Sequence, residues 1–158
     1  MDHEHHHDHH EMSTSSWRTA VSATQHCLTG CAIGEVLGMV IGTALGLHGA
    51  ITVVLAIALA FFFGYLLTMR SVLRSGAGFT AALRIALAAD TVSIVVMEIV
   101  DNSFIVAVPG AMNAGLTSAL FWGSLVLSLA IAFVVTVPVN KWMIDRGLGH
   151  AKVHAIAH

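Results

Sequence analysis

Two cysteines and a glutamate recur every four residues within an apolar stretch near the start of the chain. A helix would place Cys27, Cys31 and Glu35 on one ridge, with His26 beside Cys27 around the turn. Thiolate, imidazole and carboxylate groups together suit borderline and soft divalent metal ions, and neighbouring helices can complete the coordination shell. The ridge therefore predicts a transition-metal site. Two inert packing thiols are the alternative, because buried cysteine also behaves as a small hydrophobe.

A second group of acids lies further along the chain. A helix turning about 100° per residue puts Asp90, Met97 and Asp101 on one stripe about 16 Å long, with Glu98 about 80° away. This spacing suits a row of sites along a path better than a compact catalytic dyad. A thioether such as that of Met39 or Met97 would favour Cu(I). Copper and zinc therefore fit the combined ligands best, with nickel and cobalt as alternatives.

Both ends of the chain are rich in histidine. Residues 1–12 interleave six histidines with Asp and Glu, a composition that cannot form a core and binds Zn, Ni, Cu or Co loosely. Histidines near the other end recur every four residues. The accessory metal ligands predicted from these two segments are His3, His5, His6, His7, His9, His10, His150 and His154. A solvated tail and a surface helix with idle imidazoles are the alternative interpretations.

The elements that must hold these side chains are membrane-spanning helices. Of the 158 residues, 56% are apolar and only 10% are charged, against roughly 25% in a soluble domain. Four apolar stretches are each long enough for the roughly 20 residues that cross a hydrocarbon core. They lie near 20–47, 50–68, 79–108 and 113–139. We predict an all-α fold, a polytopic integral membrane protein with a four-transmembrane-helix bundle at 17–140, a disordered His-rich tail at 1–16 and a C-terminal segment at 141–158.

The basic residues are confined to one side of this arrangement. The N-terminal segment, the loop between the second and third stretches with the helix start after it, and the C-terminal segment carry all seven of them. The positive-inside rule then places both termini in the cytoplasm. Trp17 and Trp142 lie where interfacial anchors are expected, whereas Trp122 is predicted to pack in mid-helix.

Four of the nine acidic residues fall inside the predicted spans, namely Glu35, Asp90, Glu98 and Asp101. A carboxylate at mid-bilayer costs about 2.5 to 3.5 kcal/mol even on insertion scales. Only Arg84 and His26 could offset that cost at membrane depth, so we expect these acids to be protonated or neutralised by a visiting cation. The alternative is that one or two are protonated hydrogen-bond donors between helices. Counted from the cytoplasmic ends of their spans, Cys31 and Asp90 are predicted at comparable depths.

Two features concern how the spans are shaped and packed. Glycines recur every fourth residue in the first span, at Gly30, Gly34, Gly38 and Gly42. Such a glycine zipper makes a flat face for close helix packing, either within the chain or between copies in a homo-oligomer. The third span would be about 45 Å long as one helix, so we expect it to tilt or to break at residues 101–103.

Several separated motifs carry a family resemblance. They are His26-Cys27-x3-Cys31-x3-Glu35, Ala89-Asp90-Thr91, Met97-Glu98-Ile99-Val100-Asp101-Asn102, Pro109-Gly110-Ala111-Met112, Pro138-Val139-Asn140 and Arg146-Gly147-x-Gly149-His150. Together, across residues 17–154, they resemble a bacterial membrane-protein family, domain of unknown function 4396. The resemblance implies a compact four-helix domain in the bacterial cytoplasmic (inner) membrane, with the His, Cys, Glu and Asp positions above as its polar signature. It supplies no reaction, because the family has no established activity.

These features predict an integral membrane protein that binds, and transports or otherwise handles, a transition-metal cation through intramembrane His, Cys, Glu and Asp sites. Its expected partners are the lipid bilayer, the ion and a second copy of the chain through the first span, but no nucleic acid. An intramembrane metal-dependent enzyme or redox protein is one alternative, and a structural or assembly subunit of a membrane complex is another. Proton-coupled transport of an organic solute is a further variant. The sequence shows no fused catalytic domain and no nucleotide or haem motif, which favours transport over catalysis.

Overall fold

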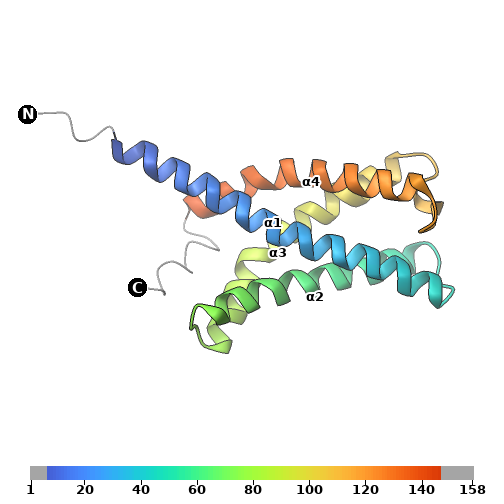
Figure 1. Cartoon of the computed structure of the whole chain (residues 1–158), viewed down its shortest axis with the longest axis horizontal. Coiled ribbons are helices and arrows are strands. Elements are labelled where there is room, and N and C mark those ends of the chain that lie inside the picture. Colours follow the sequence, from blue (N-terminus) through green and yellow to red (C-terminus); the bar gives the residue numbers. More distant parts are fainter. Residues whose placement is uncertain (1–6, 147–158) are drawn as a thin grey trace, which may run out of the picture.

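Four long helices make up the described part of the chain (Figure 1). The structure is a computed structural model that describes residues 7–146, with side chains from Ser16 onward apart from Met112. Its elements are α1 (His7–Ala44), α2 (Ala50–Arg74), α3 (Phe79–Ala107), the short 3-10 helix η1 (Ala111–Asn113) and α4 (Ala119–Asp145). These described residues contain no strand, so the prediction of an all-α fold is confirmed.

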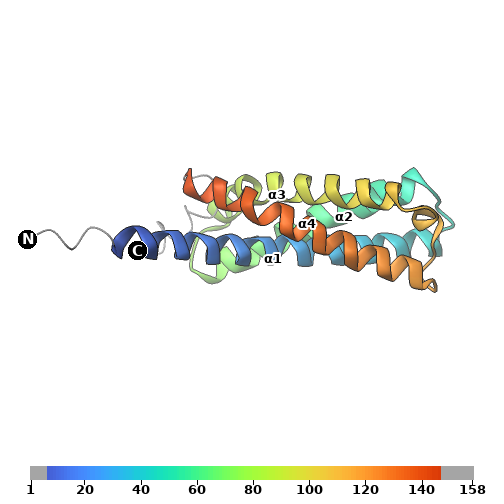
Figure 2. The ribbon, with the colours of Figure 1, turned by 90° about the horizontal axis from the view of Figure 1, so that it is seen from above.

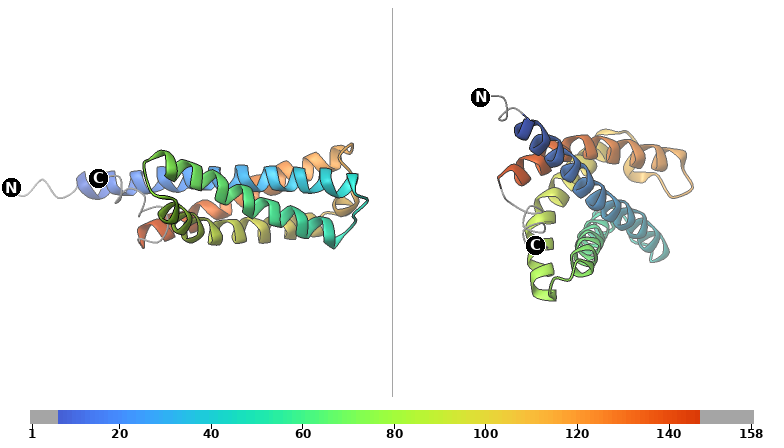
Figure 3. Two further views of the ribbon diagram at one scale, coloured as in Figure 1. Left: turned by 90° about the horizontal axis from the view of Figure 1, so that it is seen from below. Right: turned by 60° about the vertical axis from the view of Figure 1, so that its left-hand side comes forward.

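The helices run alternately up and down the bundle, and α1 begins at the end where α4 finishes (Figures 1 and 2). α1 packs along α2 and against α4, while α3 packs against the same two helices. α1 and α3 also meet across the bundle, whereas α2 and α4 hardly touch and lie apart in Figure 3. α1 and α3 are therefore the two helices whose side chains face each other in the middle.

Glycine residues mark the turns between helices. Gly49 precedes α2 with a φ of 61°, and Gly110 precedes η1 with a φ of 82°, a left-handed backbone that glycine adopts without a steric penalty. Ser118 caps α4 by accepting a hydrogen bond from the backbone N–H of Leu120. The turns therefore lie at the chain breaks that glycine indicates in the sequence.

Some helices extend beyond their predicted spans. α2 continues past residue 68 to Arg74, and α4 continues through Pro138 to Asp145. Arg70 and Arg74 in the last turns of α2 are both exposed. A long basic side chain can reach water while its helix continues, so these arginines do not end the helix. At the end of α4, Lys141 pairs with Asp145 over 2.5 Å across one helical turn.

Other boundaries also differ from the sequence expectation. α1 already begins at His7, so residues 7–16 are helical although the sequence predicts a disordered tail there; residues 1–6 lie outside the described residues. α4 begins at Ala119 rather than near 113, because η1 and the turn capped by Ser118 occupy the intervening residues. α3 runs unbroken through residues 101–103, so of the two expected alternatives the break is wrong and the tilt stays a prediction.

The glycines of the first span lie against α2. A Cβ on Gly34 would stand 2.2 Å from the backbone nitrogen of Ala60, and a Cβ on Gly30 would stand 2.6 Å from the backbone of the same helix. Gly38 and Gly42 also leave no room for a Cβ, because α2 atoms lie within 3 Å of that position. We call this contact the α1–α2 seam. The face on which the sequence allowed a homo-oligomer is thus covered by α2 of the same chain.

Three of the four long helices are long and apolar enough to cross a membrane, namely Ser16–Ala44, Ala50–Arg74 and Ala119–Asp145. α3, which carries four charged residues, is not among them. Large apolar side chains such as Val106 (68%) and Val134 (69%) are among the most exposed in the described chain. A surface of this kind suits lipid rather than water. The chain is therefore a helical membrane protein.

Candidate functional site

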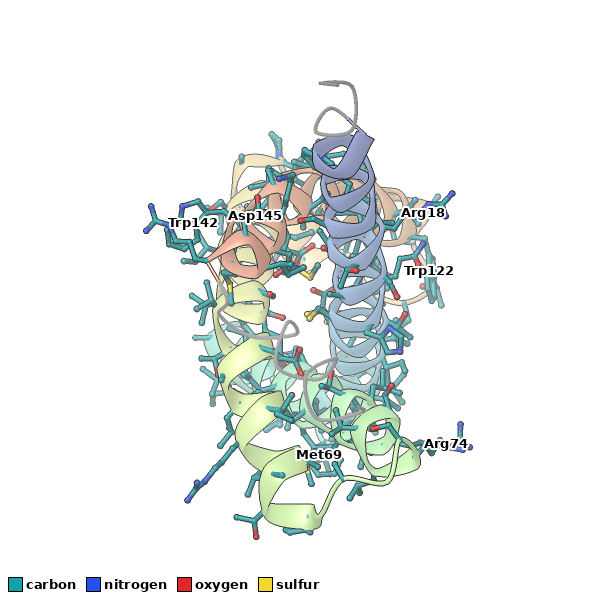
Figure 4. All side chains as sticks on the ribbon, turned by 90° about the vertical axis from the view of Figure 1, so that its left-hand side faces the viewer. Arg18, Met69, Arg74, Trp122, Trp142 and Asp145 are labelled. Carbon is teal, nitrogen blue, oxygen red and sulfur yellow. The ribbon has the colours of Figure 1, made fainter. Side chains whose placement is uncertain are left out.

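Thiol and carboxyl groups from α1 and α3 line the middle of the bundle. We call this set the interior row: Cys27, Cys31 and Glu35 from α1, and Asp90, Glu98 and Asp101 from α3. Each of the six is at most 8% exposed. Figure 4, viewed from the end where α1 begins, shows side-chain oxygen and sulfur atoms directed into the space between the helices. The two ridges derived separately from the sequence thus face each other.

The pair nearest the start of α1 consists of Cys27 and Asp90. The Sγ of Cys27 donates to the Oδ1 of Asp90 over 3.6 Å, and the hydroxyl of Thr68 from α2 also contacts this carboxylate. The sequence predicts Cys31 at the depth of Asp90, and that register is wrong by one turn. α1 begins far outside the bundle, so the membrane depth of a residue cannot be counted reliably from the predicted start of the first span.

The next pair consists of Cys31 and Glu98, whose side chains lie within hydrogen-bonding reach of each other. Asn102, one turn further along α3, donates from Nδ2 to the Oε2 of Glu98 over 3.2 Å. The other carboxylate oxygen, Oε1, is buried and has no hydrogen-bond partner among the described residues. One oxygen is thus held by Asn102, and the other has no hydrogen-bond donor among the described residues.

The pair furthest from the start of α1 consists of Glu35 and Asp101. Their carboxyl groups face each other at hydrogen-bonding range, yet neither oxygen of Glu35 receives a hydrogen bond from the described residues. Asp101 does accept a hydrogen bond, which the hydroxyl of Ser128 on α4 donates. Two carboxylates in contact repel each other in an apolar interior, so a proton or another cation must lie between them.

A neutral network closes the row at the end where α1 begins. Asn140 of α4 donates from Nδ2 to the hydroxyl oxygen of Thr24 over 2.8 Å, and the hydroxyl of Ser93 donates to the Oδ1 of Asn140. Thr24 in turn donates to the carbonyl oxygen of Ala20 over 2.8 Å. All three polar side chains are buried and hydrogen-bonded. The three side chains that flank this end of the row are therefore neutral.

The sequence does not predict most of the α4 side chains that lie beside the interior row. Ser128, Thr136 and Asn140 recur at multiples of four residues along α4, and all three are buried. Their signal is a polar ridge inside an apolar stretch, the same pattern that identifies the α1 ridge. Being uncharged, these residues resemble ordinary packing positions, which in membrane helices are often serine or threonine.

The remaining predicted ligands lie elsewhere. His26 is exposed on the outside of α1, with its Nδ1 placed 3.1 Å from the carbonyl oxygen of Ser22, so the structure does not bring it into the row. Met97 is buried in one cluster with both cysteines, whereas Met39 packs against a separate cluster around Phe121. The histidines at 3, 5, 6, 150 and 154 lie outside the described residues. Those at 7, 9 and 10 belong to α1, but their side chains are not described.

The interior row is a succession of pairs rather than one cluster. Within residues whose side chains are described, no group of three or more His, Cys, Asp or Glu lies close enough to hold a metal ion. Basic side chains in that same part of the chain are all exposed or half-buried, and Lys141 pairs with Asp145 at the end of α4. These described basic side chains therefore stay outside the row, and His26 is close enough to Asp90 only for an electrostatic interaction from the exposed side of α1.

An apolar groove of about 550 Å³ lies between α1 and α4. Leu28, Ile33, Val36 and Leu129 are among its lining residues, and none of the residues that line it belongs to the interior row. The groove thus opens on the apolar outside of the bundle. The residues of the row are instead buried inside the bundle.

Comparisons with known proteins identify the family. No curated protein and no solved structure matches the chain. The family described as Domain of unknown function (DUF4396) matches residues 16–149, a range that contains the whole interior row and the α4 residues that contact it. The resemblance noted in the sequence is therefore confirmed, and the chain belongs to the DUF4396 family.

Proposed function

We propose that the protein binds a transition-metal cation within the bilayer and transports it along the interior row. The observation that carries this proposal is a line of buried thiols and carboxyl groups, including Glu35 and Glu98 with oxygens that lack a donor. Carboxylates at membrane depth cost about 2.5 to 3.5 kcal/mol each even on insertion scales. With the described basic side chains outside the interior, a cation in the row would offset that cost.

The proposal includes α3 as a fourth membrane span. Its acids Asp90, Glu98 and Asp101 are buried, whereas its exposed side presents apolar residues such as Ile99 (62%) and Val106 (68%). A helix of this kind meets lipid with its apolar face and keeps its polar face inside the bundle. Arg84, near the start of α3, is exposed where it can reach the interface.

Tryptophans support the same placement of the bilayer. Trp142 lies near the end of α4 and Trp122 lies in its first turns, and both are exposed. They are twenty positions apart, a rise of about 30 Å, which is the thickness of a hydrocarbon core. Trp122 is therefore not the mid-helix packing residue that the sequence suggests, and it suits the second interface. The exposed basic residues near the Trp142 end then favour cytoplasmic termini. The bacterial inner membrane is the location that the family resemblance implies.

The thiols distinguish a metal cation from a proton. A proton path needs carboxyl groups and water, but it gives no role to Cys27 and Cys31 on the same buried ridge. Thiolates are the ligands that soft and borderline metal ions prefer. Pairs of ligands also suit passage, since an ion must bind each site weakly enough to leave it. A metalloenzyme would instead need about three converging ligands and one open position.

The histidines of residues 1–12 would collect the ion on the cytoplasmic side.

Vesicle transport tests the proposal. The purified full-length chain is reconstituted in liposomes that enclose a metal-responsive dye, and Cu(I), Zn(II), Ni(II) and Co(II) are each added outside. We expect at least one ion to enter faster than in protein-free liposomes. Glu98→Gln should slow entry on the order of tenfold, because it removes a carboxylate ligand while keeping the shape of the side chain.

Asp145→Asn is the matched control, since Asp145 is the exposed acid at the end of α4. It should leave the entry rate unchanged. The proposal is contradicted if none of the four ions enters faster than in protein-free liposomes, or if the two variants behave alike. Dissipation of a pH gradient without any metal would instead identify a proton path.

A further inference from the structure

Three sulfur-containing side chains lie in one buried cluster at the interior row. Cys27 and Cys31 of α1 and Met97 of α3 belong to one buried cluster, and each is 1% exposed. The other buried members of this cluster are Ala60, Ile94 and Ala132, which offer no polar ligand. Both cysteines are free thiols. The cluster therefore brings sulfur-containing side chains of two helices, α1 and α3, into one buried region.

We propose that this sulfur cluster is a binding site for a soft monovalent cation, Cu(I) or its redox-inert analogue Ag(I). The inference rests on the proposed function and narrows the class of ion. Thiolate and thioether ligands together select Cu(I). Zn(II) is almost always bound by four ligands in structural sites. The cluster offers fewer, and the imidazole of His26 lies outside the bundle.

The carboxyl groups beside the sulfur atoms complete the argument. A thiol must lose its proton to bind a metal ion. The Oδ1 of Asp90 already accepts a hydrogen bond from the Sγ of Cys27. On binding, the S–H bond gives way to a sulfur–metal bond and the proton passes to the carboxylate, with no change in oxidation state.

Glu98 provides a second, independent indication of a ligand. It is 7% exposed and lies beside Cys31, and its Oε1 has no hydrogen-bond partner among the described residues. A buried acceptor without a donor costs free energy unless something else satisfies it. A cation held by the neighbouring thiolate, or the proton released from that thiol, satisfies it.

The closing experiment compares two methionines. The full-length chain in detergent, kept reduced and anaerobic, is titrated with Cu(I) against a chromophoric Cu(I) chelator, and separately with Ag(I). Met97→Leu should weaken Cu(I) binding on the order of tenfold relative to the wild type. Met39→Leu is the matched control, since Met39 lies in a different cluster, and it should leave the affinity unchanged. Histidine-rich residues 1–12 are the same in all variants, so differences report on the cluster.

Cys27→Ser and Cys31→Ser should each abolish the thiolate-to-metal absorption in the ultraviolet, and X-ray absorption should find sulfur neighbours around the bound metal. A shift in size-exclusion elution would reveal a variant that fails to fold, and the Met97→Leu comparison then decides alone. Equal Cu(I) affinity in the two methionine variants, or nitrogen and oxygen neighbours only, would overturn the inference.

If Zn(II) enters vesicles while sulfur binds no Cu(I), this inference fails and the proposed function stands. If the cluster binds Cu(I) but no ion enters vesicles, the proposed function fails and the site stands.

Discussion

At the scale of single residues, the interior row differs from ordinary helix packing in how its polar atoms are satisfied. Most of the hydroxyl and amide groups near it find partners, as Asn140 does with Thr24 and Ser93, and the hydroxyl of Thr136 is the exception. Both oxygens of Glu35 and one oxygen of Glu98 do not. An unsatisfied buried acceptor is among the costlier features of a fold. Two glutamates with such acceptors occur in one row that also contains thiols. This combination favours a row that binds a ligand over a row that serves helix packing alone.

Ser128 is predicted to matter for stability because it donates to the buried carboxylate of Asp101. Ser128→Ala should lower the thermal unfolding midpoint in detergent, reflecting a loss of about 1 to 3 kcal/mol for an acceptor left without its donor. Thr136→Val is the matched comparison, since the hydroxyl of Thr136 is buried without a partner. That variant keeps the shape and should be neutral or stabilising. Equal shifts in the two variants would argue against this assignment of the hydrogen bond.

The sequence predicts the composition of the row better than its pairing. Charge scarcity alone identifies Glu35, Asp90, Glu98 and Asp101 as interior residues, because exposure to lipid would be too costly. Which thiol meets which acid depends on the axial offset of α1 against α3, and no local pattern encodes that offset. The same limit applies to His26. One residue of helix rotation separates it from Cys27, and the packing of α1 turns that face outward.

At the scale of helices, α1 and α2 form the closest pair in the bundle. Glycine lets their backbones meet directly, so the α1–α2 seam has no side-chain layer that could yield. The two helices should therefore act as one rigid unit.

Gly34→Ala tests the α1–α2 seam. The added Cβ would stand 2.2 Å from the backbone nitrogen of Ala60, so the helices must separate, at a cost of about 1 to 3 kcal/mol. We expect a lower unfolding midpoint in detergent. Gly123→Ala in α4 is the control, since a Cβ there meets nothing within 4 Å, and it should be neutral or slightly stabilising. Comparable destabilisation by both substitutions would contradict the packing described here.

Helix boundaries show what local sequence can and cannot determine. The turns at Gly49 and Gly110 are predictable because only glycine adopts their backbone cheaply. The extensions of α2 to Arg74 and of α4 past Pro138 are not, because charged or proline residues usually indicate a stop. Beyond the apolar layer, packing and water decide where a helix ends. The continuity of α3 through Asp101 follows from burial of that residue against α4.

At the scale of the whole molecule, charge divides the bundle into two unlike ends. The described basic residues belong to the start of α1, the end of α2, the early turns of α3 and the end of α4, which lie together in Figure 1. The α1–α2 loop and the α3–α4 connection carry none. The proposed orientation follows from this asymmetry.

Site-specific labelling tests that orientation in cells. A membrane-impermeant maleimide added from outside should label His48→Cys, in the α1–α2 loop, but should reach Ser75→Cys, in the α2–α3 loop, only after permeabilisation. The native Cys27 and Cys31 are each 1% exposed and provide an unreactive background. Labelling of Ser75→Cys from outside, with His48→Cys protected, would reverse the orientation.

Because the α1–α2 seam takes one ridge of α1 and the interior row takes the next, little of that helix is left free to vary. Gly30, Gly34 and Gly38 admit no larger residue, and Cys27, Cys31 and Glu35 are enclosed. Exposed positions, such as Ile33 and Val40 in the apolar part of the helix, point outward, where other apolar residues suffice. In a saturation mutagenesis survey, the tolerance of α1 to substitution should thus vary with the helical period of about 3.6 residues. Two ridges should be intolerant, and one face should accept substitutions. A helix devoted to anchoring alone would accept substitution far more evenly.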